Sequence, residues 1–353
     1  MVWSRAMRAA PLLLCLAVLA GCASASPSGS VPPSAAPSQA SPSVEGSVAP
    51  TGPPSVPLEE RLEATIAIDG ADFPIIAFDS VWVVAGDPPH PAIVRVDPVT
   101  NEVVADIEVP GVACTGATAG FDAIWACSTD GIVRIDRATN AVVTVIEVRT
   151  AGQARLATGG GSVWAFARVG DSLDTNAVHR IDPATNSVIT TIDLGHPVAT
   201  MAFGFDALWV SSPADGLVLR VDPASNQVTI AVEGLAAPFQ VTVGPDSLWV
   251  SLYGAEDSEP AEGEPTIVRV DPGTGEITAS IVADPIGMTG GIHADATAVW
   301  IRSGGTFLTH IDPATNEVVE VITASNGGGD LVVGFGSVWA AGYNFHQLWR
   351  VSP

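Results

Sequence analysis

Short apolar runs separated by turn residues follow one another from about residue 61 to the end of the chain. In the first unit these runs are 75–78, 81–84, 92–96 and 102–109. They are rich in Val and Ile, and Gly, Pro, Asn or Asp residues bound them. Such runs are typical of β-strands rather than helices. The unit therefore predicts a four-stranded antiparallel meander.

This unit occurs seven times. Each copy contains an aliphatic-Trp step, and the intervals between the steps are 39 to 51 residues, which indicates an array of supersecondary units. The tryptophans are Trp82, Trp125, Trp164, Trp209, Trp249, Trp300 and Trp339. A single sheet of this size cannot cover both of its apolar faces, so neighbouring sheets must stack around an axis. The sequence predicts an all-β fold, a seven-bladed β-propeller.

An Asp-Pro-x-Thr-Asn type of turn joins the third and fourth strands of most units, as at residues 97–101. Proline suits the second turn position, the Asp side chain accepts from backbone N–H groups, and Asn tolerates a left-handed conformation. The motif thus has a complete structural explanation. Functional residues are expected where the copies differ.

The chain ends are expected to close the ring. The seventh unit stops at Pro353, where its fourth strand should begin, and residues 61–68 form a strand pattern without a unit of its own. We expect 61–68 to complete the last blade, which removes an open sheet edge.

The copies resemble the YVTN-repeat, or YncE-like, propellers, and residues 180–192 are the copy most similar to that pattern. The resemblance covers roughly residues 61–353 and implies the fold without a particular activity. A more distant similarity, at residues 204–209, is to the streptogramin lyases. That similarity implies an alternative function, a lyase or hydrolase at the channel mouth, although the chain has no Glu-x-His arrangement of the kind associated with that family's catalytic centre.

The N-terminal segment predicts export and lipidation. A basic start precedes a short apolar run and Leu-Ala-Gly-Cys22, which resembles a bacterial lipobox. An ordinary signal peptide with an incidental cysteine is the alternative. We expect a signal peptide at 1–21, lipid on Cys22, a Ser/Pro/Ala-rich tether at 22–57 and the propeller at 58–353. The protein would then be extracytoplasmic and anchored to the bacterial cell membrane.

Cys114 and Cys127 remain after processing, and they flank a predicted hairpin with its turn at 119–122. If residue 118 opposes residue 123, then Cys114 opposes Cys127 at a separation that suits a disulfide. Two free thiols or a metal pair are the alternatives.

Acidic residues outnumber basic ones by 38 to 14, giving a formal net charge of −24. Such a surface repels phosphate backbones, so nucleic-acid binding is rejected. Cations or a basic partner fit this charge, as does a solubilising role alone.

The longest second-to-third-strand loop, 253–264, carries Glu256, Asp257 and Glu259, which are candidate calcium ligands. The loop lacks EF-hand spacing, and the alternative is a solvated charge run.

Other departures from the repeat are candidate ligand-binding residues at one channel mouth. Arg155, Gln240 and Asp330 stand nine residues before a repeated Trp, and Arg168, Asp174 and Tyr343 lie in divergent loops. They suit a small polar ligand or a peptide, and solvation of the channel explains them equally well.

His293 and His346 are candidates for an acid–base pair or for part of a metal site, with ordinary inner-strand packing as the alternative. No local motif of a hydrolase, zinc protease or phosphate-binding loop occurs. The sequence therefore predicts a monomeric, non-catalytic binding module without a cofactor, whose partner is an unknown protein, peptide or small polar ligand.

Overall fold

The computed structural model describes residues 52–86, 91–111, 113–150, 155–168, 175–253, 260–286, 290–325 and 327–353, without the side chains of 113–115. Cys22, Asp174 and the candidate calcium ligands Glu256, Asp257 and Glu259 lie outside these residues. Within them, no helix has the length and apolar character needed to cross a membrane.

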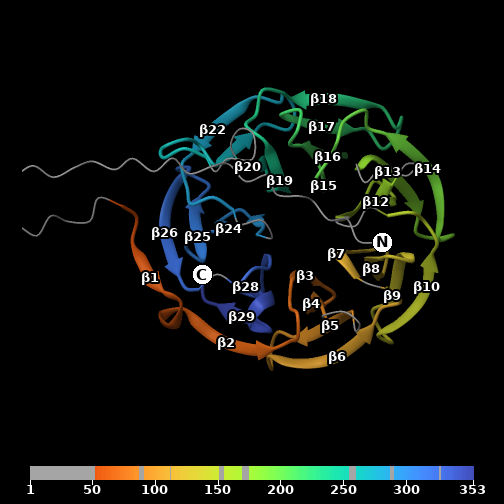
Figure 1. The fold of residues 1–353 in the computed structure, drawn as a ribbon, viewed down its shortest axis with the longest axis horizontal. Coiled ribbons are helices and arrows are strands. Elements are labelled where there is room, and N and C mark those ends of the chain that lie inside the picture. Colours follow the sequence, from red (N-terminus) through yellow and green to blue (C-terminus); the bar gives the residue numbers. More distant parts are fainter. Residues whose placement is uncertain are drawn as a thin grey trace, which may run out of the picture. The chain divides into compact units, whose positions relative to one another are not determined.

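Seven blades, each of four antiparallel strands, form a closed ring, which confirms the predicted seven-bladed propeller (Figure 1). The first strand of each blade lies nearest the axis, and the fourth lies at the rim. Blades 1 to 3 contain β3 (Phe73–Ala77), β4 (Ser80–Ala85), β5 (Ala92–Asp97), β6 (Glu102–Glu108); β7 (Ala113–Gly120), β8 (Ala123–Ser128), β9 (Gly131–Asp136), β10 (Ala141–Ile146); and β11 (Leu156–Gly159), β12 (Ser162–Arg168), β13 (Thr175–Asp182), β14 (Ser187–Asp193).

The remaining blades follow the same order. Blades 4 to 7 contain β15 (Met201–Gly204), β16 (Ala207–Ser212), β17 (Leu217–Val221), β18 (Val228–Val232); β19 (Pro238–Val243), β20 (Leu248–Leu252), β21 (Ile267–Val270), β22 (Ile277–Ile281); β23 (Ile292–Ala294), β24 (Val299–Arg302), β25 (Leu308–Asp312), β26 (Glu317–Thr323); and β27 (Leu331–Gly334), β28 (Ser337–Gly342), β29 (Gln347–Val351) with β2 (Leu62–Ala67). Two short 3-10 helices are η1 (Leu58–Glu60) and η2 (Tyr343–Phe345).

The N-terminal strand closes the ring as predicted. β2 pairs antiparallel with β29, from Leu62 opposite Val351 to Ala67 opposite Gln347. A second strand was not predicted: β1 (Ser55–Pro57) pairs in parallel with β26, the outer strand of blade 6. These three residues belong to the stretch for which composition predicts a tether, so the propeller begins before residue 58.

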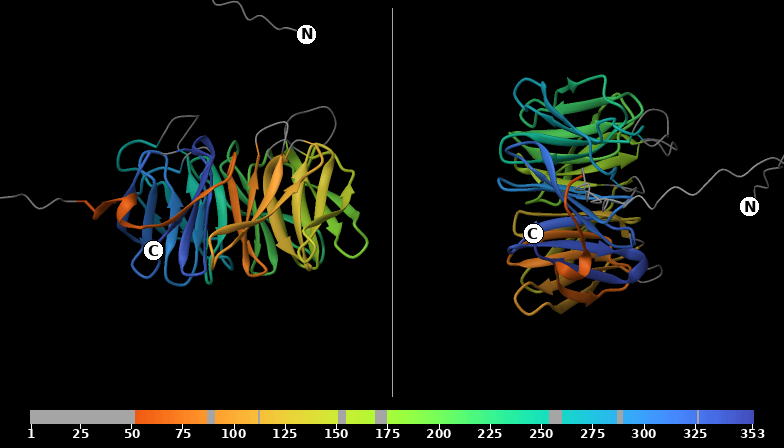
Figure 2. Two further views of the ribbon diagram at one scale, coloured as in Figure 1. Left: turned by 90° about the horizontal axis from the view of Figure 1, so that it is seen from below. Right: turned by 90° about the vertical axis from the view of Figure 1, so that its left-hand side faces the viewer.

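The connections divide the ring into two faces (Figure 2). Because successive strands are antiparallel, the first-to-second and third-to-fourth turns share one face, here called the turn face. The second-to-third connections and the links between blades share the other, here called the linker face. The start of every inner strand therefore lies at the linker face.

The repeated Trp side chains form the packing between blades. Each is at most 1 % exposed, and in most blades the indole N–H donates to the carbonyl of the residue five positions earlier, as Trp82 does to Ala77 at 3.0 Å. An arginine of the third strand lies over the indole, as Arg95 does over Trp82 at 4.8 Å. The other such pairs are Arg134–Trp125, Arg180–Trp164, Arg220–Trp209, Arg269–Trp249 and Arg350–Trp339.

Five of these arginines also join their blade to the next at the turn face. Arg95 Nη1 donates to the Arg137 carbonyl at 2.9 Å and to Asn140 Oδ1 at 3.0 Å, both in the third-to-fourth turn of blade 2. Arg134, Arg180, Arg269 and Arg350 make the corresponding pair of bonds. The turn asparagines have φ values of 54° to 60°, as predicted for the left-handed position. The repeat therefore encodes an arginine clamp between neighbouring blades as well as a turn.

Two departures from the clamp follow from this geometry. The last blade has no third-to-fourth turn, because β2 comes from the other end of the chain. Blade 6 accordingly has His310 in place of the arginine, stacked on Trp300 with ring centroids 4.4 Å apart. Blade 5 has Gly275 in place of the turn asparagine, so its turn offers no amide acceptor to Arg220 of blade 4.

The hairpin of the two cysteines corrects one prediction. The turn consists of Phe121 and Asp122, with Gly120 opposite Ala123, so residue 118 opposes residue 125 instead of residue 123. An irregularity between Ala113 and Ala117 then restores the predicted register at the far end, where Ala113 opposes Ser128. Cys127 is disulfide-bonded, and its partner's side chain lies outside the description. Pairing with Cys114 stays a prediction.

Candidate ligand site at the linker face

Two of the divergent residues meet across the ring. Arg155, at the start of the inner strand of blade 3, forms an ion pair with Asp330 of blade 7, with Nη1 and Oδ2 2.9 Å apart. The Arg155 side chain is 22 % exposed and the Asp330 side chain 12 %. The pair joins two blades that are not neighbours and lies at the linker face, where both inner strands begin.

Asp330 is held in place by the backbone. Its Oδ1 accepts a hydrogen bond from the Leu331 N–H at 2.7 Å, and its own N–H donates to the Asp72 carbonyl at 2.8 Å. Gly291 of blade 6 provides the room, because a Cβ there would lie 1.5 Å from Asp330 Oδ1. The glycine that occupies the divergent position in blade 6 thus complements the aspartate in blade 7.

Asp72 adds a second carboxyl group to this cluster. Burial, reinforced by the negative charge of Asp330, raises the pKa of Asp72 to about 7, and the positive charge of Arg155 opposes this shift. Asp72 Oδ1 is buried and has no hydrogen-bond partner among the described residues. This carboxyl group therefore changes its protonation near neutral pH.

Aromatic side chains border the guanidinium. The Arg155 guanidinium carbon lies 4.4 Å from the centroid of the Phe73 ring, and Phe73 itself is 5 % exposed. Burial raises the pKa of Tyr253 to about 12. The positive charge of Arg155 acts against this shift, which indicates that the phenol of Tyr253 lies near the same guanidinium. Tyr253 stacks in turn on Phe239, with ring centroids 4.6 Å apart. Arg155, Asp330, Asp72 and Phe73 are here called the mouth cluster.

A second arginine lies behind Asp330. Arg302, at the end of β24, is 1 % exposed and donates to the carbonyls of Phe307 at 3.0 Å and Ala341 at 3.3 Å. Burial lowers its pKa to about 10, and the charge of Asp330 opposes this shift.

The other divergent residues do not join this ion pair. Gln240 is buried, and its amide donates to the Gly290 carbonyl at 3.0 Å. Arg168 ends β12, where its N–H donates to the Arg149 carbonyl at 3.0 Å. Tyr343 begins η2 in the second-to-third connection of blade 7 and is 36 % exposed.

The two candidate histidines have separate environments. His346 Nδ1 accepts a hydrogen bond from the Gly70 N–H at 3.1 Å, in the link between blades 7 and 1. His293 lies on β23. Burial lowers its pKa, and the negative charges of Asp295 and Asp330 partly oppose this shift. Within the described part of the chain, no hydrogen bond joins the two imidazoles. The acid–base hypothesis for this pair stays a prediction.

No group of three or more His, Cys, Asp or Glu side chains in the described residues has the geometry to hold a metal ion. The calcium hypothesis for Glu256, Asp257 and Glu259 stays a prediction, since these residues lie outside the description.

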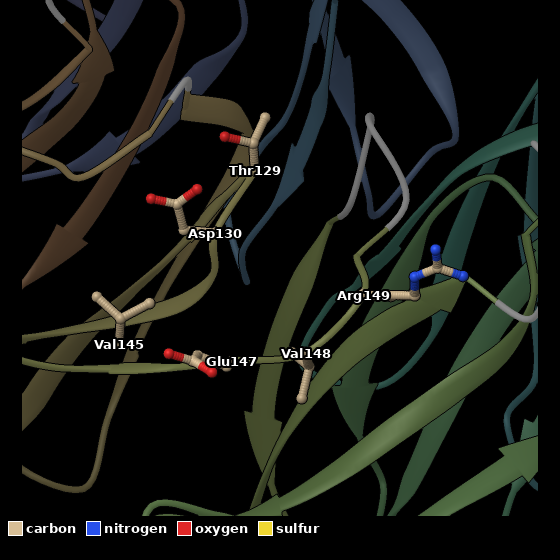
Figure 3. Close-up of a pocket in the computed structure, with 6 residues that line it drawn as sticks. All are labelled: Thr129, Asp130, Val145, Glu147, Val148 and Arg149. Carbon is tan, nitrogen blue, oxygen red and sulfur yellow. The ribbon is translucent and has the colours of Figure 1, made fainter.

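A shallow hollow of about 610 Å³ lies on the linker face of blade 2 (Figure 3). Its lining contains the carboxyl groups of Asp130 and Glu147, the guanidinium of Arg149, and Thr129, Val145 and Val148. These residues come from the second-to-third connection of the blade and from the end of its outer strand.

Sequence reasoning identified Arg155 and Asp330 but missed Asp72, Phe73 and Arg302. Phe73 occupies the same position before its Trp as Arg155 and Asp330 do, and Asp72 precedes it by one residue. A comparison that included the position before each divergent residue would have found Asp72.

The comparisons with known proteins identify the fold alone. No family model matches the chain, and no curated protein matches it in sequence. Among solved structures, hydrazine synthase of Kuenenia stuttgartiensis is similar with a TM-score of 0.63 at 12 % identity, over 82 % of this chain and 97 % of that one. The computationally designed protein Ika8 is similar with a TM-score of 0.59 at 11 % identity, over 83 % of this chain and all of that one.

Proposed function

We propose that this protein is a binding module, displayed outside a bacterial cell membrane, that recognises its ligand at the linker face. The observation that carries this proposal is the convergence of Arg155, Asp330 and Asp72 from three blades at the linker face. The turn face, in contrast, has the same arginine clamp in most blades. Recognition needs residues that differ from one blade to another, and the linker face provides them.

The fold supports a binding role, because a propeller presents connections from all of its blades around one axis. The net charge of −24 favours a cationic or polar ligand over a nucleic acid. The similarity of the repeat to YVTN-type propellers is compatible with this proposal and supplies no ligand. Fold alone does not determine function, so the site must be tested directly.

A pair of aromatic residues with matched exposure allows that test. Tyr343 lies at the linker face and is 36 % exposed, and Phe121 lies at the turn face and is 39 % exposed. Each is replaced separately by the photo-crosslinking residue p-benzoylphenylalanine, and intact cells are irradiated. We expect adducts from position 343 and few from position 121. Equal adduct yields from the two positions, or none from position 343, would contradict the proposal.

We further propose that lipid on Cys22 anchors the protein, as the lipobox-like segment indicates. Replacing Cys22 with Ala should abolish incorporation of a labelled fatty acid and release the protein from the membrane fraction. Ser24→Ala is the matched control and should leave both unchanged. Membrane association of the unlabelled Cys22→Ala variant would refute lipid anchoring.

Cys127 is disulfide-bonded, and we propose Cys114 as its partner because the neighbouring pair Ala113 and Ser128 is in register. Alkylation without a reductant should leave the mass of the mature protein unchanged, and reduction should make both thiols reactive. For so short a loop the bond contributes at most about 3 kcal/mol. Alkylation of Cys114 in the unreduced folded protein would refute the pairing.

A further inference from the structure

The mouth cluster has the composition of a receptor for an organic cation. A carboxylate, Asp330, lies 2.9 Å from the Arg155 guanidinium, and the face of Phe73 lies 4.4 Å from its central carbon. Carboxylates and aromatic faces are the groups that bind guanidinium and quaternary ammonium ions in proteins. In this structure the protein's own arginine occupies the position of the cation.

Asp330, Asp72 and Phe73 are here called the walls of the mouth cluster. They are held more firmly than the Arg155 guanidinium that contacts them. Asp330 Oδ1 accepts a hydrogen bond from the Leu331 N–H, and the Asp330 N–H donates to the Asp72 carbonyl, so the Asp330 carboxyl group is held by the backbone and the main chains of blades 7 and 1 are joined. Arg155 comes from blade 3 and keeps 22 % of its side chain exposed. Its guanidinium contacts this region through the ion pair and through stacking on Phe73. Exchange of the guanidinium therefore leaves the walls in place.

The walls also contain a hydrogen-bond acceptor that Arg155 leaves unsatisfied. Asp72 Oδ1 is buried without a hydrogen-bond partner among the described residues. Removal of the guanidinium would also uncover the face of Phe73, which is now 5 % exposed. A cation that reached Asp72 as well as Asp330 would satisfy an acceptor that Arg155 leaves unsatisfied.

We infer that the mouth cluster binds the guanidinium or ammonium group of a cationic ligand, which displaces Arg155 from Asp330 and Phe73. This inference rests on the proposed binding function and names the chemical class of its ligand. The net charge of −24 supports it, because the field of the whole protein concentrates cations near the surface. The displaced Arg155 side chain would turn toward solvent.

The probe for the test is N-acetyl-L-arginine amide, with N-acetyl-L-citrulline amide as its neutral counterpart of nearly equal shape. Binding of each to the mature protein is measured by titration calorimetry. We expect the wild-type protein to bind the arginine probe and not the citrulline probe. Arg155→Ala should bind the arginine probe roughly tenfold more tightly, because no resident cation has to be displaced.

Two further variants locate the site. Asp330→Asn should abolish binding of the arginine probe, and Phe73→Leu should weaken it about fivefold through loss of the aromatic face. Thermal unfolding of each variant is measured first. If Asp330→Asn does not fold, Phe73→Leu and Arg155→Ala still test the inference, because they leave both carboxyl groups intact.

Three results would overturn the inference. The first is no binding of the arginine probe to the wild-type protein, even if Arg155→Ala binds it, since Arg155 would then be a permanent structural residue. The second is equal binding of the citrulline probe, and the third is binding that Asp330→Asn leaves unchanged. If photo-crosslinks form at position 343 while the arginine probe does not bind, the proposed binding function stands and the inference of a cationic ligand is wrong.

Discussion

The turn face and the linker face both depend on arginine, and they use it differently. On the turn face Arg95 bonds to the turn of the next blade, and four other blades repeat this arrangement. On the linker face Arg155 pairs with Asp330 on a blade that is not its neighbour, and no repeat relates the two. A contact repeated around the ring stabilises the ring, whereas a single contact across the mouth contributes less to closure. A single contact such as the Arg155–Asp330 ion pair can be exchanged for a contact with a ligand.

The largest effect is expected at the turn face. Arg95→Ala removes bonds to Ser80 Oγ, the Arg137 carbonyl and Asn140 Oδ1, together with the stacking on Trp82. It should lower the free energy of unfolding by about 3 kcal/mol, measured by urea denaturation.

Arg220→Ala is the matched control, because the turn of the next blade has Gly275 in place of asparagine and Arg220 stacks on Trp209 at the longer distance of 5.9 Å. It should cost about 1 kcal/mol. Equal losses in the two variants would show that the clamp to the next turn contributes nothing beyond stacking.

A smaller effect is expected where the mouth cluster is tightly packed. Gly291→Ala places a methyl group 1.5 Å from Asp330 Oδ1, which must move away from Arg155 and the Leu331 N–H. The free energy of unfolding should fall by about 2 kcal/mol.

The double variant Gly291→Ala/Asp330→Ala separates this clash from a general intolerance of Ala at position 291. Because Asp330→Ala removes the clashing carboxyl group, adding Gly291→Ala to it should cost little. A full additional loss in the double variant would contradict the proposed complementarity.

The smallest effect concerns pH. In the folded protein the pKa of Asp72 is about 7 against an ordinary value of 3.8, so the folded state binds its proton more tightly than the unfolded state does. This group therefore favours folding at low pH, and its contribution is lost as the pH rises toward 7. Asp72→Asn lacks this loss, and its stability relative to wild type should increase by about 1 kcal/mol between pH 6 and pH 7. Parallel pH profiles of the two proteins would exclude a raised pKa for Asp72.

The sequence predicted the ring because each blade repeats its own strand pattern, and the unpaired pattern at 61–68 predicted how the ring closes. It did not predict β1, because Ser55–Pro57 has only three residues and no alternation. The hairpin turn was predicted at 119–122, whereas Phe121 and Asp122 alone form it. Both residues have positive φ, of 52° and 62°, where sequence rules expect glycine or asparagine.

The site was predicted only in part for a different reason. Arg155 and Asp330 stood out because each interrupts the repeat, yet their ion pair joins residues 175 positions apart and depends on the diameter of the ring. The contact of Gly291 with Asp330 likewise depends on how neighbouring blades stack. The clamp between Arg95 and Asn140 was hidden for the opposite reason, since both residues are repeated and the asparagine already had an explanation within its own turn.

The most direct test of the division between the faces is to map a bound cation by amide NMR. N-acetyl-L-arginine amide is titrated into the deuterated, ¹⁵N-labelled propeller, and chemical-shift changes are followed at both faces. We expect changes at Phe73, Tyr253 and Leu331 on the linker face, with Val99 and Asn140 on the turn face unaffected. Changes centred on Val99 and Asn140, or no changes at Phe73 and Leu331, would contradict it.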